Sequence, residues 1–418
     1  MTKRIMDKSG ALLLCFALGL CVQGAACLGS VPDGDNFLDP GTAMGIIPYI
    51  PSPEPDLSVG AFSVAGSMRF PRRDYAAVKL NDGRIFISGG IDIAGNLGFL
   101  NQCEIYDPAT DTFTATANSM SVSRHRHSAV LLNDGRVLIT GTDNFSDGNK
   151  AEIFDPSTGA FTTTGNMNDE RFRHTSVLMA DGRVLIMGGC RLNCGTQTLS
   201  SAEIFNPGTG NFTTTGSMPV PRHSFRAVLI GTRVLTTGGI DDSTGSNPLY
   251  RNEAEWYSGG TFTSLAGMTS ERGNHTLTKL SDTRYLLAAG HGASDQLTSL
   301  EIFDSTTETF SAAPGGLNRK RDQHSAVVFQ SDANLTGKVL IMGGYNGDSS
   351  DELVFSSVEL YDPDTGQSID QPSMSDNHYG HSAFTITRDG KEQVIVIAGS
   401  GGTGTDGIFQ FAELFIPF

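Results

Sequence analysis

The sequence predicts an all-β fold built from seven similar units of about fifty residues. A short apolar segment, which reads AEIF at Ala151–Phe154, recurs along the chain with a glutamate at its second position. These glutamates are Glu104, Glu152, Glu203, Glu255, Glu301, Glu359 and Glu413. Successive glutamates lie 48, 51, 52, 46, 58 and 54 residues apart, a period typical of repeat architectures. Turn signals about every ten residues, in a chain with 50 glycines, favour short strands over helices.

Each unit contains the elements of a four-stranded antiparallel sheet. The segment AEIFDPSTGAFTTTGNM (Ala151–Met167) is followed by Arg-x-x-His, an apolar run, Asp-Gly-Arg, a second apolar run and a pair of glycines. The apolar runs are rich in β-branched residues, and Asp-Gly, Gly-Gly with a polar loop, and DPSTG separate them. Seven copies of this pattern fill residues 61–418.

Seven such sheets are expected to stack around an axis. A single four-stranded sheet cannot bury both of its faces, whereas radial stacking buries them against neighbours and gives a seven-bladed β-propeller. The seventh unit ends at AELFIPF (Ala412–Phe418) and lacks its outermost strand. Ala61–Met68 (AFSVAGSM) matches Ala160–Met167 (AFTTTGNM), which contains the expected outermost strand of another unit. This N-terminal segment is therefore expected to supply the missing strand and close the last blade.

The repeat resembles the kelch family of β-propellers. The resemblance rests on GRVLIMGG (Gly182–Gly189), with its glycine pair, and on AEIFDPSTGAF, with its strand-turn-strand pattern. Kelch units usually carry tryptophan in the last strand, where this chain has Phe113, Phe161, Phe212, Phe262 and Phe310. A phenyl ring is expected to pack in the same way, but the difference points away from animal adaptor-type kelch proteins and towards bacterial, exported ones.

The N-terminus has the pattern of an export signal. Residues 1–26 combine a basic start, the short apolar run Ala11–Val22 and small residues before Cys27. The small residues resemble a bacterial lipobox, in which the cysteine is lipidated, although Gly24 stands where leucine is usual; ordinary signal-peptidase cleavage is the alternative. Residues 27–60, rich in proline and acidic residues, are expected to form a tether. The expected location is the cell surface or outer membrane, or alternatively the periplasm or the medium.

Charge limits the partners that the chain can bind. The net charge is −16, which disfavours nucleic acid, because phosphate binding needs clustered lysine and arginine. We therefore expect an extracellular protein or glycan as the partner, contact with a membrane only through a lipid on Cys27, and a monomer.

The Arg-x-x-His segments are the first candidate site. They occur as Arg124/His127, Arg171/His174, Arg272/His275 and Arg321/His324. Elsewhere the histidine position holds Tyr75, Phe225 and His381, and the arginine position holds Arg72, Arg222 and His378. A catalytic base does not tolerate Phe, whereas a packed ring does, so the main hypothesis is architectural. The alternative is a composite ligand site made by these arginines and histidines around the channel mouth.

The sequence predicts no catalytic residue and no metal or other cofactor. It contains no G-x-S-x-G, H-E-x-x-H or P-loop string. A copper-radical oxidase on this fold needs a cysteine cross-linked to tyrosine and further Tyr and His ligands; His378 and His381 fill ordinary repeat positions, and Cys103 takes the place of Ala151. Calcium is the one cofactor considered, for the acidic loops Asp143–Asn149, Asp241–Asn247 and Asn346–Glu352, but no calcium motif supports it.

Four long loops are the second candidate site. They lie between the second and third strands of their units, at Ile91–Gln102, Cys190–Ser201, Ile240–Glu253 and Tyr345–Ser357, and they differ from one another while the strands stay alike. Cys190 and Cys194, in one loop, are expected to form a disulfide. Variable loops on a repeated scaffold favour an interaction module that recognises a protein or glycan. A carbohydrate-active enzyme of the mutarotase or lyase kind, with a site at the channel mouth, is the alternative.

Overall fold

The computed structural model describes residues 60–418 apart from 93–97, 145, 193, 244, 246, 348–353 and 402–409. The expected export signal (1–26), Cys27 and all but the last residue of the expected tether lie outside these ranges. The described residues form strands and turns, with no helix long and apolar enough to cross a membrane.

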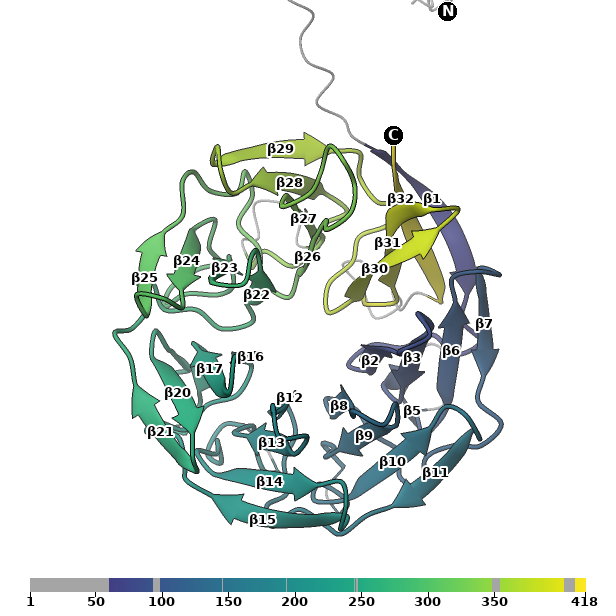
Figure 1. Cartoon of the computed structure of the whole chain (residues 1–418), viewed down its shortest axis with the longest axis vertical. Coiled ribbons are helices and arrows are strands. Elements are labelled where there is room, and N and C mark those ends of the chain that lie inside the picture. The colour runs from purple at the N-terminus through teal and green to yellow at the C-terminus, as the bar shows by residue number, and fades with distance from the viewer. Residues whose placement is uncertain are drawn as a thin grey trace, which may run out of the picture. The chain divides into compact units, whose positions relative to one another are not determined.

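Seven four-stranded antiparallel sheets are arranged around a central axis (Figure 1). Blade 1 consists of β2 (Ala76–Lys79), β3 (Ile85–Ser88), β6 (Cys103–Asp107) and β7 (Thr112–Ala115). Blade 2 consists of β8 (Ser128–Leu131), β9 (Val137–Thr140), β10 (Ala151–Asp155) and β11 (Ala160–Thr163). Blade 3 consists of β12 (Thr175–Leu178), β13 (Val184–Met187), β14 (Ala202–Asn206) and β15 (Asn211–Thr215). Blade 4 consists of β16 (Arg226–Ile230), β17 (Arg233–Thr237), β20 (Ala254–Ser258) and β21 (Thr261–Ser264).

The remaining blades follow the same order. Blade 5 consists of β22 (Thr276–Lys279), β23 (Arg284–Ala288), β24 (Leu300–Asp304) and β25 (Thr309–Ala312). Blade 6 consists of β26 (Ser325–Val328), β27 (Val339–Met342), β28 (Val358–Asp362) and β29 (Gln367–Gln371). Blade 7 consists of β30 (Ser382–Arg388), β31 (Lys391–Ile397), β32 (Phe411–Pro417) and β1 (Gly60–Ser67). Short hairpins, β4 (Ile91–Asp92) with β5 (Gly98–Phe99) and β18 (Ile240–Asp241) with β19 (Leu249–Tyr250), project from blades 1 and 4.

The N-terminal strand closes the ring, as the sequence predicted. Strand β1 pairs antiparallel with β32, with Ala61 opposite Ile416 and Val64 opposite Glu413. In Figure 1 the purple β1 lies along the yellow β32 at the outer edge of blade 7. The ring of Phe62 packs on that of Phe415, with centroids 5.2 Å apart. Blade 7 thus contains the two ends of the propeller.

The hydrophobic core is divided among the seven interfaces between blades. Strand β13 illustrates the reason, because its four residues are buried and alternate residues face opposite neighbours. Val184 and Ile186 join a cluster shared with blade 2, while Leu185 and Met187 join one shared with blade 4. Each blade therefore depends on both neighbours for the burial of its apolar side chains.

The phenylalanines of the outer strands pack as expected for the tryptophan they replace. Each lies directly opposite an aromatic residue on the third strand, and the two ring centroids are 4.7–4.8 Å apart. The pairs are Tyr106–Phe113, Phe154–Phe161, Phe205–Phe212, Tyr257–Phe262 and Phe303–Phe310. The last strand of the blade is thereby fixed without an indole ring.

The glycine pairs mark the points where neighbouring blades touch. At Gly188 the backbone has φ +58°, and a Cβ would lie 2.5 Å from the carbonyl oxygen of Arg222 in the next blade. The N–H of Gly189 donates to that same carbonyl at 3.0 Å. A side chain at Gly188 would separate the two blades, which explains why the glycine recurs.

Candidate functional site

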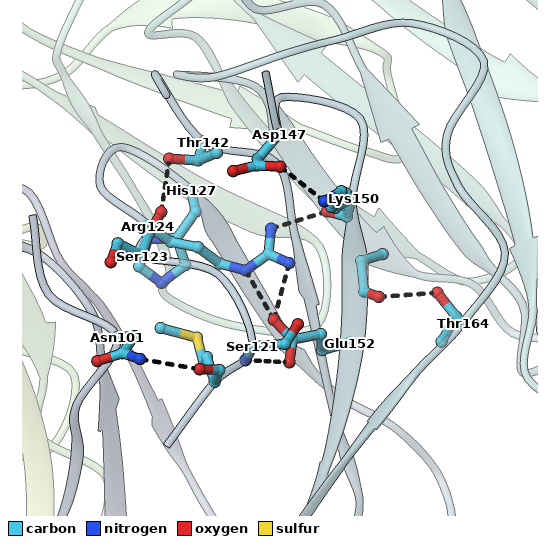
Figure 2. Close-up of polar contacts among 12 residues, drawn as sticks. Asn101, Ser121, Ser123, Arg124, His127, Thr142, Asp147, Lys150, Glu152 and Thr164 are labelled. Carbon is cyan, nitrogen blue, oxygen red and sulfur yellow. Dashed lines mark hydrogen bonds and ion pairs between the residues drawn. The ribbon is translucent and has the colours of Figure 1, made fainter. Parts of the chain in front are cut away.

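In six of the seven blades, a buried ion pair joins an arginine in the segment before the first strand to a glutamate on the third strand. The pairs are Arg72–Glu104, Arg124–Glu152, Arg171–Glu203, Arg222–Glu255, Arg272–Glu301 and Arg321–Glu359. Figure 2 shows the pair of blade 2, in which the guanidinium of Arg124 also donates to the carbonyl of Lys150 and Glu152 accepts from the backbone N–H of Ser121. The glutamate that marks every repeat is therefore the partner of its arginine.

In blade 3 the hydrogen bonding of this pair is nearly complete. Arg171 donates to Glu203 at 2.8 Å and to the carbonyls of Gly188 and Ser201 at 2.8 and 3.1 Å. Glu203 also accepts from the backbone N–H groups of Asn168 and Asp169. The side chains of Arg171 and Glu203 are 0% exposed. Arg171 is thus bonded inside its blade and is inaccessible to a ligand.

Blade 7 performs the same task with histidine. In His378, Nδ1 lies 3.0 Å from the carbonyl of Ala398 and Nε2 lies 3.0 Å from Glu413. His378 therefore takes the place that arginine has in the other blades, as the buried partner of the repeated glutamate.

The histidines of the Arg-x-x-His segments join neighbouring blades. Nε2 of His174 lies 2.9 Å from the hydroxyl of Thr140 in blade 2. The same contact joins His127 to Ser88, His275 to Thr237, His324 to Thr276 and His381 to Ser325. Between blades 7 and 1, the hydroxyl of Tyr75 accepts from the N–H of Ser382 at 2.9 Å. A direct role of these segments in ligand binding stays a prediction, and their contacts here are architectural.

The buried histidines make stability depend on pH. Burial, reinforced by the charges of Arg171 and Arg124, lowers the pKa of His174 to about 3, and burial lowers the pKa of His127, His275, His324 and His381 well below its usual value. Between about pH 6.5 and pH 3, unfolded His174 binds a proton that the folded residue does not. The folded state is therefore expected to lose stability as the pH falls through this window.

His174→Phe tests this assignment. We expect the variant to fold, because Phe225 occupies the same position in blade 4 and is buried there. Loss of the bond to Thr140 should lower the free energy of unfolding by about 1 kcal/mol at neutral pH. Below pH 6, the pH dependence should become shallower by about 1.4 kcal/mol per pH unit. Urea unfolding at several pH values measures the free energy of unfolding and its pH dependence.

An unchanged pH dependence of the free energy of unfolding would refute the assignment of a buried neutral imidazole. Loss of ligand binding by a folded variant would make His174 a binding residue.

The third residue of each Arg-x-x-His segment lies at the channel mouth. These seven residues have φ between 50° and 61°, and they are Asp74, Arg126, Arg173, Ser224, Asn274, Gln323 and Gly380. Backbone N–H groups donate along the series, from Arg126 to the carbonyl of Asp74 (2.7 Å) through to Gly380 and the carbonyl of Gln323 (2.9 Å). The left-handed backbone, costly for residues other than glycine, is thus repeated because it ties each blade to the next.

These residues line a cavity of about 370 Å³, which we call the channel cavity. Tyr75, His127, His174, Thr175, Phe225 and Arg226 complete its lining. Of the eight arginines and histidines predicted as ligand-binding, the cavity lining includes His127 and His174. The four arginines Arg124, Arg171, Arg272 and Arg321 are fully buried within their blades. The arginines at the mouth are thus different ones from those that the sequence singled out.

Three guanidinium groups and one carboxylate line the channel cavity. Arg126 lies between two acids, with Nε 3.4 Å from Asp74 and Nη1 3.1 Å from Asp143. Nε of Arg226 donates to the carbonyl of His275 at 2.6 Å. Burial lowers the pKa of Arg173, and the charge of Arg126 lowers it further. The cavity is therefore positive, and His127 and His174 are uncharged at neutral pH because of their lowered pKa values.

Sequence reasoning missed Arg126, Arg173 and Arg226, although two signals could have identified them. The third position of the Arg-x-x-His segment varies among the units while its neighbours repeat. Arg226 begins an inner strand where the other blades have the small residues Ala76, Ser128, Thr175, Thr276, Ser325 and Ser382. Departures from a repeat mark candidates for function, because repeated positions build the scaffold.

The long loops open on the same face as the channel cavity. Isolated β-bridges join Arg73 to Ile91, Phe172 to Cys190, His223 to Ile240 and Asp322 to Tyr345. Each bridge ties an Arg-x-x-His segment to the start of one loop. We call this side of the propeller the loop face; the Asp-Gly turns lie on the opposite face.

Two smaller expectations fall on these loops. Cys190 and Cys194 are joined in a disulfide, with a Cα–Cα distance of 5.0 Å. His223 lies beside them, but sulfurs bonded to each other are not thiolate ligands. In the acidic loops, Asp143 faces His125 and Arg126, and Asp147 faces Lys150. Calcium binding by these loops stays a prediction.

Comparison with known proteins agrees with this geometry. The family described as Kelch motif matches residues 171–219 and 326–375, which cover blade 3 and most of blade 6. The chain folds as a kelch-type β-propeller. No curated protein matches it.

One solved structure has a fold similar to that of this chain. It is a fungal alcohol oxidase of the AA5 family in complex with copper, with a TM-score of 0.65 and 17% identity, covering 86% of this chain and 77% of that one. Such a likeness shows the fold alone. Among the described residues, the two histidines considered for copper have other partners, since His378 lies beside Glu413 and His381 beside Ser325. Burial raises the pKa of the Cys103 thiol to about 12, so it stays protonated.

Proposed function

We propose that this kelch propeller is a ligand-binding interaction module whose binding site is the loop face. The observation that carries the proposal is the gathering of variable residues on that face. The four long loops start there, and the seven blades contribute six different residue types to the channel cavity. The opposite face carries the short repeated turns. Diversity on one side of a rigid scaffold is what recognition requires.

The kelch fold itself supports an interaction module. Propellers present loops on a fixed ring, so a partner meets a surface that is organised before binding, which reduces the entropy lost on association. The expected partner is an extracellular protein or glycan, bound by a monomeric propeller. Replacement of the four long loops tests the proposal for either kind of partner.

An enzyme acting on carbohydrate at the channel mouth is the second candidate. The described residues that line the channel cavity include a single carboxylate, Asp74, and it lies beside Arg126. Glycoside hydrolysis usually needs two carboxylic groups that flank the scissile bond. The lining therefore favours binding over hydrolysis. Turnover of a sugar by the intact propeller, followed by NMR, would favour the enzyme instead.

Removal of the loops tests the proposed function. A variant in which Ile91–Gln102, Cys190–Ser201, Ile240–Glu253 and Tyr345–Ser357 are replaced by short Gly-Asn turns should keep a similar melting curve, because the blade cores lie elsewhere. It should lose binding to the partner that a glycan and matrix-protein array identifies for the intact propeller. A control variant with altered Asp-Gly turns on the opposite face should bind normally. Undiminished binding by the variant without loops would refute the proposal.

Export is part of the same proposal. Residues 1–26 have the composition of a signal peptide, and the disulfide Cys190–Cys194 suits an oxidising compartment. A lipid on Cys27 would hold the propeller at a membrane, and cleavage without lipidation would release it. Mass spectrometry of the mature N-terminus distinguishes the two, and a mature protein that still begins at Met1 would contradict export.

A further inference from the structure

We propose that the channel cavity binds the acidic group, a carboxylate or a sulfate, of a saccharide residue, and that Arg126, Arg173 and Arg226 hold it. These three residues are called the arginine cluster. The proposal rests on the proposed function, since it names the ligand class for the same face.

The first argument is charge. The arginine cluster and Asp74 line one cavity in a chain whose net charge is −16. Among the described residues, the guanidinium of Arg173 makes no ion pair within 4 Å, whereas Arg171, two residues earlier, meets both Asp169 and Glu203. Arg126 has Asp74 and Asp143 beside it, but Arg173 lies next to Arg126 without an ion-pair partner of its own among the described residues. An anion bound beside Arg173 would therefore stabilise its charge.

The second argument is the hydrogen-bonding capacity of the cluster. Nε of Arg226 donates to the carbonyl of His275. The two terminal nitrogens of Arg226 make no hydrogen bond to a described residue. Arg226 is exposed to the channel, and Arg126 is 30% exposed. A guanidinium presents paired N–H groups that match the oxygens of a carboxylate or sulfate. The cluster therefore has donors available where the channel opens.

The third argument concerns the rest of the lining, which favours a sugar. Asn274 and Gln323 bring amide groups, and Ser224 and Thr175 bring hydroxyls. Amides and hydroxyls have both donor and acceptor capacity, which sugar hydroxyls require. Part of it is used inside the protein, since Thr175 donates to the carbonyl of Phe225 and Ser224 is bonded to His223. A volume of about 370 Å³ lies in the range of small-ligand sites, about 300–1,000 Å³. One charged sugar residue, at the end or side of a longer glycan, suits this cavity better than a folded domain does.

The fourth argument is that the cluster is specific to particular blades. Arg226 stands where six blades have Ala, Ser or Thr, and Arg126 and Arg173 come from two adjacent blades next to it. The architecture does not need arginine at these positions, because the other blades close without it. Side chains that the scaffold does not need, and that repel one another, are expected where function requires them.

Calorimetric titration of the full propeller with defined oligosaccharides tests the proposal. The probes are oligogalacturonate, the same oligomer as its methyl ester, a sulfated oligosaccharide, and an oligoglutamate peptide. We expect an acidic oligosaccharide to bind and the methyl ester to bind at least about tenfold more weakly, since a charge-assisted hydrogen bond is lost. The carboxylate and sulfate probes distinguish the two sources of the charge.

Two cluster variants and a control complete the test. Arg173→Gln and Arg226→Ser, the latter giving the residue of three other blades, should each weaken binding about tenfold to a hundredfold. Arg183→Gln, at an exposed Asp-Gly turn on the opposite face, should leave the affinity unchanged. Equal binding of acid and ester, or equal affinity of Arg173→Gln and wild type, would overturn the proposal. Tighter, Arg173-dependent binding of oligoglutamate would overturn the saccharide assignment. If no anion binds but the loop-dependent partner does, this inference is wrong and the proposed function stands; if neither binds, both are wrong.

Discussion

Arg171→Met is expected to lower the free energy of unfolding by about 3–5 kcal/mol, which is the usual cost of leaving one partner of a buried ion pair alone. Glu203 would keep its charge at 0% exposure, and the carbonyls of Gly188 and Ser201 would lose a donor. Urea unfolding of the purified propeller measures the loss. The same loss is expected for the arginine of the corresponding pair in blades 1, 2, 4, 5 and 6.

Two controls separate the buried charge from the loss of side-chain packing. The double variant Arg171→Met/Glu203→Gln should recover much of the loss, because the unpaired charge is gone and the amide oxygen still accepts from the N–H of Asn168. Arg183→Met breaks a pair whose side chains are 46% and 49% exposed, so it should cost less than about 1 kcal/mol. A loss at Arg171 as small as that at Arg183 would contradict the architectural role.

Deletion of residues 60–68 should destabilise the propeller more widely. It would remove β1, expose the backbone edge of β32 and uncover Phe415, which Phe62 now covers. An exposed edge strand pairs with other chains, so we expect aggregation and a melting temperature lower by about 10 °C or more. Thermal unfolding with light scattering detects both effects.

The matched control for this deletion is removal of residues 28–57. These residues precede β1, and their proline-rich acidic composition is not that of a packed core. Their deletion should leave the melting temperature within about 2 °C of the full chain, a shift that corresponds to less than about 1 kcal/mol. Equal melting temperatures for the 60–68 deletion and the full chain would refute closure of the ring by β1.

The fold could be predicted because the same pattern of strands and turns occurs in seven units. The period of the glutamates fixed the number of blades, and AFSVAGSM identified the closing strand by its likeness to the fourth strand of other units. The role of the glutamate itself was missed. The repeated glutamate serves only to align the units in the sequence analysis, although a carboxylate in an apolar strand needs a buried partner. The arginine position supplies one in every unit but the last.

The candidate site was harder to predict, because the positions that repeat build the scaffold whereas the cavity is lined by positions that vary among the units. Arg171 and His174 were considered for a ligand site, and the structure engages them inside and between blades. Arg173 lies between them, and the sequence analysis assigns it no role. Its direction depends on a left-handed backbone at φ 52°, and periodicity gives no information about φ at one position. The cavity also needs residues from seven distant units, which only the closed ring brings together.

The most direct test compares Arg171 with Arg173 in one thermal-shift experiment, with and without oligogalacturonate. Arg171→Gln should lower the melting temperature of the free propeller by about 5 °C or more, as expected for the loss of several kcal/mol. Arg173→Gln should keep or raise it, because an unpaired cation beside Arg126 is removed, and should abolish the shift that oligogalacturonate causes in the wild-type protein. If Arg173→Gln instead destabilised the free propeller as strongly as Arg171→Gln and kept the shift caused by oligogalacturonate, the division between repeated architecture and blade-specific function would be wrong.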